Sequence, residues 1–267
     1  MSLIKYPQHA IQLMYETAHS YGSKVRTYAN GLGGTTEQTP KGFFIFCQGR
    51  TGSTLLCNLL DKHPRIHCDR EILSQERWNP VWFVTGKRNR AEGVSRYGFK
   101  AKIYQLTNQQ RLEDPAQFVY TLANRGWDII YLWRRNVLRH SFSGHIAAAK
   151  DLWHAKKKDA AHDRKVKKSV HVDPDALLRD AYQRQCWLNK EREILEHVNY
   201  FEINYEDDLM EASARNEMLK KLCVFLNVEP MTFQPDTKRT VKKLSDQVSN
   251  YSSIVDKIKG TELETML

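Results

Sequence analysis

The residues best suited to chemistry lie in one short loop of glycines, hydroxyl side chains and a single arginine: Gly49, Arg50, Thr51, Gly52, Ser53 and Thr54. An apolar run at 43–46 precedes the loop and leucines at helical spacing follow it at 55–60, so we expect a strand, the loop and then a helix. Glycines let a backbone approach a ligand closely, and a helix N-terminus directs free N–H groups and the positive end of its dipole into such a loop. The loop therefore suits an oxyanion.

This loop differs from the one that binds nucleoside triphosphates. That motif has a lysine after its second glycine, and the next hydroxyl coordinates magnesium. Here Ser53 follows Gly52, and the cation, Arg50, comes before the glycine. We therefore expect a guanidinium and hydroxyls to hold the anion, with no obligatory metal.

Two further segments place polar side chains where a predicted strand ends. The apolar run at 128–133 predicts a buried strand that ends at Arg135, and Ser143 follows two turns down the next helix. An arginine and a hydroxyl so placed can share one phosphate, the arginine through paired hydrogen bonds. Another predicted strand, at 200–205, ends in Tyr205-Glu206-Asp207.

Taken in this order, the three segments resemble the sulfotransferases that use 3′-phosphoadenosine 5′-phosphosulfate (PAPS). The resemblance covers roughly residues 42–267. It implies that residues 50–54 hold the phosphosulfate, that Arg135 and Ser143 hold the 3′-phosphate, and that Tyr205 lies near the adenine. One departure is Val137, where the family often has proline.

The C-terminal region carries Leu244-Ser245-Asp246, Asn250-Tyr251 and Gly260-Thr261-Glu262. This pattern resembles the bacterial branch of that family, which includes the trehalose, Nod-factor and lipopolysaccharide sulfotransferases. Lys242 and Lys243 lie where the family closes basic residues over the 3′-phosphate, although the Arg-Lys-Gly of the animal cytosolic members is missing. The implied reaction moves a sulfuryl group from PAPS to a hydroxyl of a carbohydrate or glycolipid-like acceptor by in-line attack. PAPS is then the sulfate donor, and no metal takes part.

The same resemblance implies a glutamate base in the loop after the first helix. Glu71 has the family spacing from Gly52, and Asp69 is the nearest rival. The apolar neighbours of Glu71 lead us to expect a raised pKa, which suits a base at neutral pH. Lys100 and Lys102 lie on one side of a predicted strand at 98–103, where a lysine can neutralise charge on the leaving group.

Strands and helices alternate along the chain, which predicts an α/β protein with a mostly parallel central sheet covered on both faces. With the resemblance, we expect a P-loop-like three-layer α/β/α fold. Residues 1–41 are interpreted as an N-terminal extension, helical to about residue 22, with a glycine-rich linker at 31–36, and residues 42–267 as the sulfotransferase domain. Asp114 followed by Pro115 predicts the start of a helix, which we expect to end at Asn124.

Composition narrows the setting and leaves partners open. The 267 residues carry a net charge of +10, and the five cysteines show no C-x-x-C spacing, which favours a reducing, cytoplasmic location. We find no leader or membrane-length apolar stretch, so we expect a soluble protein without stable membrane insertion. The basic stretch 154–168 is interpreted as an exposed, solvated loop, and an anion-binding lid is the alternative. Related bacterial enzymes can be dimers, so a homodimer stays open.

Two alternatives remain at this point. A P-loop small-molecule kinase would bind ATP and magnesium, and a basic nucleic-acid-binding module would use the lysines of 156–168 with a steep salt dependence. We favour the enzyme that uses PAPS, with a hydroxylated small molecule or glycolipid as partner and no nucleic acid. The residues suggested for the acceptor pocket, which are equally plausible as core, are Trp78, Trp82, Phe83 and the region of Trp153. His140 and His145 are expected to be exposed, and the histidines show no paired metal spacing.

Overall fold

The computed structural model describes residues 22–33, 36–150, 169–231 and 243–267. Its centre is a five-stranded sheet in the order β2-β3-β1-β4-β5, and every neighbouring pair of strands is parallel. The strands are β1 (Lys41–Cys47), β2 (Ile66–Cys68), β3 (Arg96–Lys102), β4 (Asp128–Trp133) and β5 (Tyr200–Asn204).

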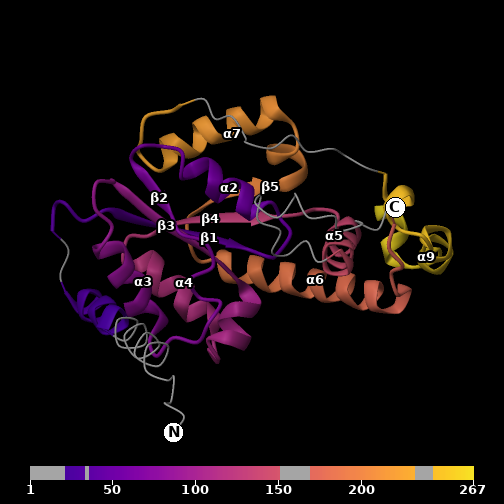
Figure 1. Cartoon of the computed structure of the whole chain (residues 1–267), viewed down its shortest axis with the longest axis horizontal. Helices are drawn as coiled ribbons and strands as arrows, with labels where there is room; N and C mark the ends of the chain where they lie inside the picture. The colour runs from indigo at the N-terminus through magenta and orange to yellow at the C-terminus, as the bar shows by residue number, and fades with distance from the viewer. Residues whose placement is uncertain (1–21, 34–35, 151–168, 232–242) are drawn as a thin grey trace, which may run out of the picture.

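Helices cover both faces of this sheet (Figure 1). One face carries α2 (Ser53–Leu60) and α7 (Ala212–Phe225), and the other carries α3 (Pro80–Asn89), α4 (Pro115–Asn124) and α6 (Pro174–Leu195). The predicted three-layer α/β/α fold with a parallel sheet is confirmed. The predicted start at Asp114 is also confirmed, because its carboxylate accepts a hydrogen bond from the N–H of Ala116 at 2.9 Å.

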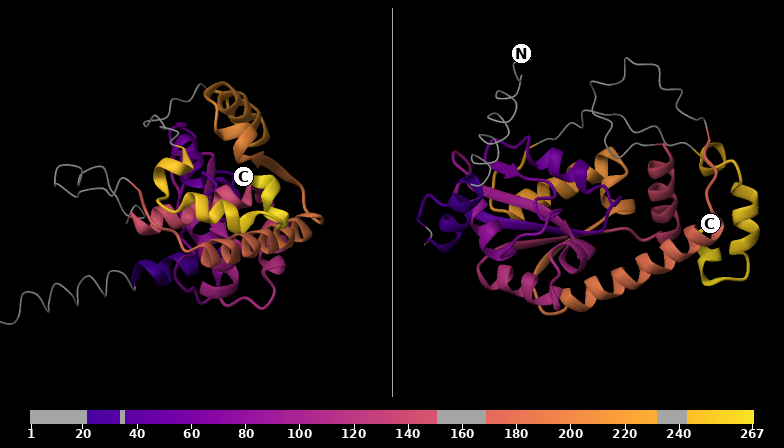
Figure 2. Two further views of the ribbon diagram at one scale, coloured as in Figure 1. Left: turned by 90° about the vertical axis from the view of Figure 1, so that its right-hand side faces the viewer. Right: turned by 60° about the horizontal axis from the view of Figure 1, so that its bottom comes forward.

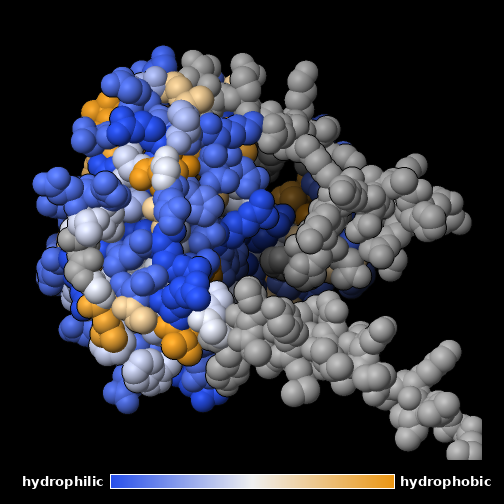
Figure 3. Space-filling view, turned by 60° about the vertical axis from the view of Figure 1, so that its left-hand side comes forward, coloured by the Kyte–Doolittle hydropathy of each residue, from blue (hydrophilic) through white to orange (hydrophobic). Residues whose placement is uncertain are grey.

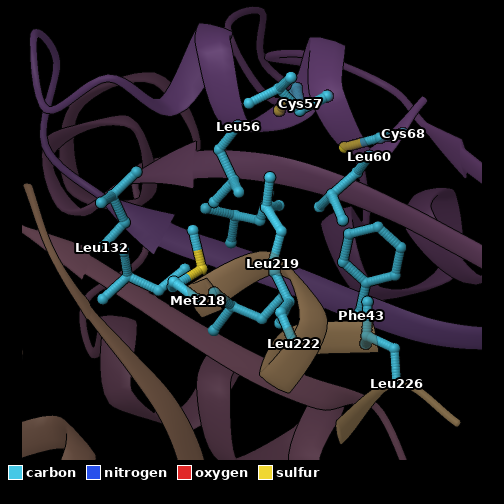
Figure 4. Close-up of a cluster of buried hydrophobic side chains, with 14 of the residues drawn as sticks. Phe43, Leu56, Cys57, Leu60, Cys68, Leu132, Met218, Leu219, Leu222 and Leu226 are labelled. Atoms are coloured by element: carbon cyan, nitrogen blue, oxygen red, sulfur yellow. The ribbon is translucent and has the colours of Figure 1, made fainter. Parts of the chain in front are cut away.

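Alternation along β1 explains why the sheet is buried on both sides. Phe43, Ile45 and Cys47 face α2 and α7, whereas Phe44 and Phe46 face the opposite layer. All five side chains are fully buried. Leucines from α2 and α7 close the first cluster (Figure 4). A strand with two apolar faces belongs in the middle of a parallel sheet, and β1 is the central strand.

A third apolar cluster lies at one end of the sheet, where α5 (Val137–Ala149) packs on α6. It also takes in the C-terminal helices α8 (Leu244–Gln247), α9 (Tyr251–Ile258) and η4 (Glu262–Met266) (Figures 1 and 2). A short parallel bridge between Val170 and Val248 ties this end together. The C-terminal segment is thus anchored beside the helix that follows β4.

Residues 22–32 form a helix that lies against α3 (Figure 2). The two backbones touch at Gly86, where an added Cβ would lie 1.7 Å from the carbonyl oxygen of Thr27. Asn89 donates a hydrogen bond to the carbonyl of Asn30 at 2.7 Å. Gly31 and Leu32, which the sequence suggested as the start of a linker, are instead the last residues of this helix.

The surface is largely hydrophilic on the face drawn in Figure 3, with small separate apolar patches. Among the described residues, no helix is both long and apolar enough to span a bilayer.

Candidate functional site

The candidate site lies where the parallel strands end. Cys47, Lys102, Trp133 and Asn204 are the last residues of β1, β3, β4 and β5, so the segments that follow them meet at one edge of the sheet. This is the edge at which open parallel sheets bind ligands. Four groups of residues lie there: the anion loop (49–54), the lysine pair (Lys100 and Lys102), the arginine segment (134–143) and the tyrosine segment (205–209).

The anion loop turns sharply between β1 and α2. Gly52 has φ +86° and Arg50 has φ +71°, both in the left-handed region. The buried hydroxyl of Thr51 donates to the carbonyl of Gln48 at 2.8 Å and closes the turn. A Cβ at Gly52 would lie 2.9 Å from the ring of Tyr205, so the tyrosine segment leaves room only for glycine here.

Lys100 joins the anion loop to the candidate base. Its ammonium donates to Thr54 Oγ1 at 2.8 Å and to Ser53 Oγ at 3.3 Å, and it lies 3.4 Å from Glu71 Oε1. Only 2% of the residue is exposed. The alternation of β3 produces this contact, because Lys100 and Lys102 point to the α2 side while Phe99 and Ala101 pack on the other face.

Glu71 is held by two cations and an amide. Its Oε2 lies 2.7 Å from Lys102 Nζ and accepts from Gln105 Nε2 at 3.0 Å. Burial alone would raise the pKa of Glu71, but Lys102 and Lys100 together outweigh it and hold the pKa below its ordinary value. The expectation of a raised pKa was wrong, because the pairing of β2 with β3 brings lysines from a distant part of the sequence to this carboxylate.

The rival carboxylate faces a different surface. Asp69 accepts from the hydroxyl of Tyr97 at 2.7 Å and lies 3.5 Å from both Lys87 Nζ and His67 Nε2. None of these partners belongs to the anion loop. The structure therefore brings Glu71, and not Asp69, to Lys100 and the loop hydroxyls.

The anion loop and the arginine segment contact each other through their side chains. Arg50 Nε donates to Ser143 Oγ at 3.3 Å. Burial lowers the pKa of Arg50, and the nearby charges of Arg134 and Arg184 lower it further. Glu206 lies 3.1 Å from Arg134 Nε and Asp180 lies 2.9 Å from Arg184 Nε, so carboxylates offset part of the positive charge around the loop.

The arginine segment and the tyrosine segment also contact each other. Glu206 accepts from Arg134 Nε at 3.1 Å and from the backbone N–H of Arg135 at 2.9 Å, while the Arg135 guanidinium pairs with Asp207. The guanidinium of Arg134 lies 4.4 Å above the ring centre of Tyr205. The Tyr205 ring is buried between Arg134 and Gly52, so it shapes the loop from behind.

His140 is buried beneath the loop, contrary to the expectation that it is exposed. Its Nε2 lies 2.5 Å from the carbonyl oxygen of Gly49, to which Arg184 Nη1 also donates at 3.3 Å. Burial and the charge of Arg184 hold the pKa of His140 well below its ordinary value, so the ring is neutral. The expectation failed because α5 packs against α6 and against the loop at once.

A buried acid on α6 supports the loop from the opposite layer. Glu191 Oε2 accepts from Gln48 Nε2 at 3.3 Å and from the hydroxyl of Tyr131 at 3.2 Å. Burial raises the pKa of Glu191 to about 8. The hydrogen bonds from Gln48 and Tyr131 lower the pKa, but by less than burial raises it. This side chain is thus largely protonated at neutral pH.

Several residues near the loop were not singled out from the sequence. Arg134 has a weak signal, since it precedes Arg135 at a strand end. Arg184, Glu191 and Gln105 have none, because helix and turn positions of this kind are ordinarily exposed polar sites and only the packing of α6 and β3 brings them here.

The other predicted residues lie apart from this group. Lys243 is exposed at the start of α8, and Lys242, like the stretch 154–168 and Trp153, falls outside the described residues. Phe83 is core, and Trp82 lines a hollow at the opposite edge of the sheet. Within the described ranges, no group of three or more His, Cys, Asp or Glu side chains is arranged to hold a metal ion.

Comparisons with known proteins add little beyond the fold. No protein family matches the chain, and no curated protein does. Among solved structures, a sulfotransferase from Alicyclobacillus acidocaldarius is 17% identical, with 82% of this chain and 89% of that chain covered and a TM-score of 0.49. A likeness of this size shows neither what this chain acts on nor which reaction it performs.

Proposed function

We propose that this chain is a PAPS-dependent sulfotransferase that acts on a hydroxyl of a carbohydrate or glycolipid-like acceptor. The observation that carries the proposal is the position of Lys100, which contacts Ser53, Thr54 and Glu71 together. A loop suited to an oxyanion and an ionised carboxylate thus share one buried cation. Transfer of a sulfuryl group needs these three parts side by side.

Each part has a role in the transfer. The backbone N–H groups of residues 51–54, with Arg50 and the hydroxyls of Ser53 and Thr54, hold the phosphosulfate of the donor. The hydroxyl of Thr51 closes the turn of the loop instead. Arg135 and Ser143 recognise the 3′-phosphate, with Lys242 and Lys243 closing over it. Tyr205 keeps the loop curved at Gly52. Residues 42–267 form the catalytic unit, and no metal is required.

The reaction is a single in-line displacement. Glu71 takes the proton of the acceptor hydroxyl as its oxygen attacks the sulfur, and the bond from sulfur to the bridging phosphate oxygen breaks. The products are the sulfate ester, 3′-phosphoadenosine 5′-phosphate and a protonated Glu71. Lys100 and Lys102 favour the ionised carboxylate beforehand, and Lys100, next to the loop hydroxyls, offsets the charge that develops on the leaving phosphate.

The acceptor and the setting belong to the same proposal. We assign a carbohydrate or glycolipid-like acceptor from the resemblance to the bacterial branch. The five cysteines are free thiols, which suits the reducing cytoplasm.

Thermal shift with three ligands tests the donor. At a concentration of about 100 times its Kd, 3′-phosphoadenosine 5′-phosphate should raise Tm by roughly 5–10 °C, because binding to the native state alone contributes about 2.7 kcal/mol. ATP with magnesium and an oligonucleotide should raise it little. Stabilisation by ATP–magnesium alone would favour a kinase, and stabilisation by the oligonucleotide alone would favour a nucleic-acid-binding module.

Transfer of labelled sulfate from PAPS to a panel of sugars, glycolipids and phenols tests the reaction. Glu71→Gln should keep the thermal shift and lose about 10²–10⁴-fold in turnover. Glu76→Gln, a change at an exposed carboxylate a few residues away, is the matched control and should leave turnover unchanged. Near-full activity in Glu71→Gln would remove Glu71 as the base.

A further inference from the structure

A second hollow lies at the opposite edge of the sheet, where the strands begin. Its volume is about 460 Å³, within the range of small-molecule sites. Trp127 lines it immediately before Asp128, the first residue of β4. The helix of residues 22–32 and α3 supply the other walls through residues 31–33 and Trp82. The hollow therefore shares no residue with the site at the strand ends.

Two arginines line this hollow, and no Asp or Glu is among its described lining residues. Arg88 is 6% exposed, donates to Asn89 Oδ1 at 2.9 and 3.1 Å, and lies 5.6 Å from the ring centre of Trp127. Arg125 comes from the turn after α4. Across the described ranges, no carboxylate is ion-paired with either arginine. Burial lowers the pKa of Arg88, and the charge of Arg125 lowers it further, so the two cations repel each other across the hollow.

Two buried polar atoms from the same walls have no hydrogen-bond partner within the described part of the chain. They are the indole N–H of Trp127 and the hydroxyl of Thr85, and both residues are more than nine-tenths buried. A buried donor without a partner costs free energy, and native proteins rarely keep one without a reason. The indole can only donate, and the guanidiniums can only donate. The charged side chains among the described lining residues are therefore donors only, whereas the Thr85 hydroxyl can donate or accept.

A flat apolar wall completes the hollow. Trp82 is half-buried and held edge-on against Trp78, whose ring centre is 5.5 Å away. Asn79 caps α3 by accepting from the backbone N–H of Trp82 at 3.0 Å, so Trp82 lies in the first turn of the helix. A rigid indole face suits the flat body of an aromatic or sugar ligand.

We propose that this hollow binds a small organic oxyanion: a carboxylate, phosphate or sulfate-ester head between Arg88 and Arg125, with a flat body against Trp82. The head accepts hydrogen bonds from both guanidiniums. It also removes the repulsion between the two cations. This site is separate from the proposed donor site and does not depend on the proposed transferase activity.

Calorimetric titration of the full chain tests the site with phenyl phosphate, phenyl sulfate and benzoate, and with benzyl alcohol as the neutral counterpart. All titrations include saturating 3′-phosphoadenosine 5′-phosphate, so that the other anion site is filled if it exists. Indole N–H signals of ¹⁵N-labelled protein provide a local readout, because Trp82 and Trp127 line the hollow. At least one anion should bind and shift an indole signal, and benzyl alcohol should not.

Arg125→Gln is the deciding variant, because Arg125 is exposed and its replacement leaves the core intact. It should weaken the anion about ten- to hundredfold, as expected for one charge-assisted hydrogen bond. Arg88→Gln should weaken it at least as much. Arg179→Gln, at an exposed arginine on α6, is the control and should bind as the natural chain does.

Three results would overturn the proposal. They are equal affinity in Arg125→Gln, equal affinity for benzyl alcohol, or no binding of any anion. Because Arg125 is exposed, the test stands even if Arg88→Gln does not fold.

Discussion

Replacing Lys102 by methionine perturbs the proposed base without touching it. The Lys102 ammonium lies 2.7 Å from Glu71 Oε2, and Lys100 Nζ lies 3.4 Å from Oε1. At an effective dielectric constant of about 20, these contacts amount to roughly 6 and 5 kcal/mol of attraction before desolvation is subtracted. Lys102→Met therefore removes about half of the attraction that opposes the burial of this carboxylate.

The net loss of stability should be smaller than that attraction. Breaking a fully buried pair costs about 3–5 kcal/mol, but Glu71 keeps Lys100 and Gln105, and 30% of its side chain is exposed. We expect Lys102→Met to lower the free energy of unfolding by about 1–3 kcal/mol. The matched control is Lys190→Met, which removes an exposed pair of similar length, 2.9 Å, and should cost under about 0.5 kcal/mol.

The dependence of this loss on pH has a definite sign. The pKa of Glu71 in the folded protein lies below its ordinary value of 4.5, so its ion pairs stabilise the fold above that pH and stop doing so as pH falls through the folded pKa. The difference in stability between the natural chain and Lys102→Met should thus be full at neutral pH and narrow in acid. Urea unfolding at several pH values measures it.

The same variant should change the pH profile of sulfate transfer. With Lys102 gone, burial is less opposed, the pKa of Glu71 rises, and the acid limb of kcat/KM moves towards neutral pH. Lys102→Arg should leave the limb close to its natural position. An acid limb that stays in place or moves to lower pH in Lys102→Met would refute the assignment of Glu71 and the charge balance around it.

Three other perturbations test separate features. Gly52→Ala should lower Tm more than Gly93→Ala. Both glycines have a positive φ, which costs an alanine about 1–2 kcal/mol, but only at Gly52 would the added Cβ meet the ring of Tyr205. Equal losses of Tm in the two variants would contradict the packing of Tyr205. Burial raises the pKa of Glu191 to about 8, so between pH 4.5 and 8 the native protein keeps a proton that the unfolded chain loses. The free energy of unfolding therefore falls as pH rises through this range. Glu191→Gln should therefore gain Tm relative to the natural chain by pH 8, and a constant difference between pH 5 and 8 would contradict this. Arg135→Met should lower the affinity for 3′-phosphoadenosine 5′-phosphate about tenfold and leave the affinity for adenosine 5′-phosphate unchanged in titrations. An equal loss of affinity for both nucleotides would show that Arg135 does not bind the 3′-phosphate.

Local patterns were enough to predict the layers and the loop. The apolar run of β1 predicts a central strand, and β1 is central because both of its faces are apolar. Alternation places Lys100 and Lys102 on one side of β3, and both reach Glu71. Period and burial are properties of short segments, so a single sequence carries them.

Charge and burial around the loop depend on contacts between distant segments, and there the sequence was a poor guide. The pKa of Glu71 depends on lysines that only strand pairing brings near. His140 is buried because α5 is covered on more than one side, and Arg184 reaches Gly49 from the middle of α6. No spacing in the chain encodes these meetings.

The backbone contact between the helix of residues 22–32 and α3 has a consequence for how the chain can be shortened. Thr27 and Gly86 touch so closely that the two helices form one packed layer, and Tyr28 adds its ring to the cluster around Phe83. A fragment that begins at Lys41 would leave this apolar surface open to water. Such a fragment should aggregate more readily than the full chain, even though it keeps every residue of the proposed catalytic site.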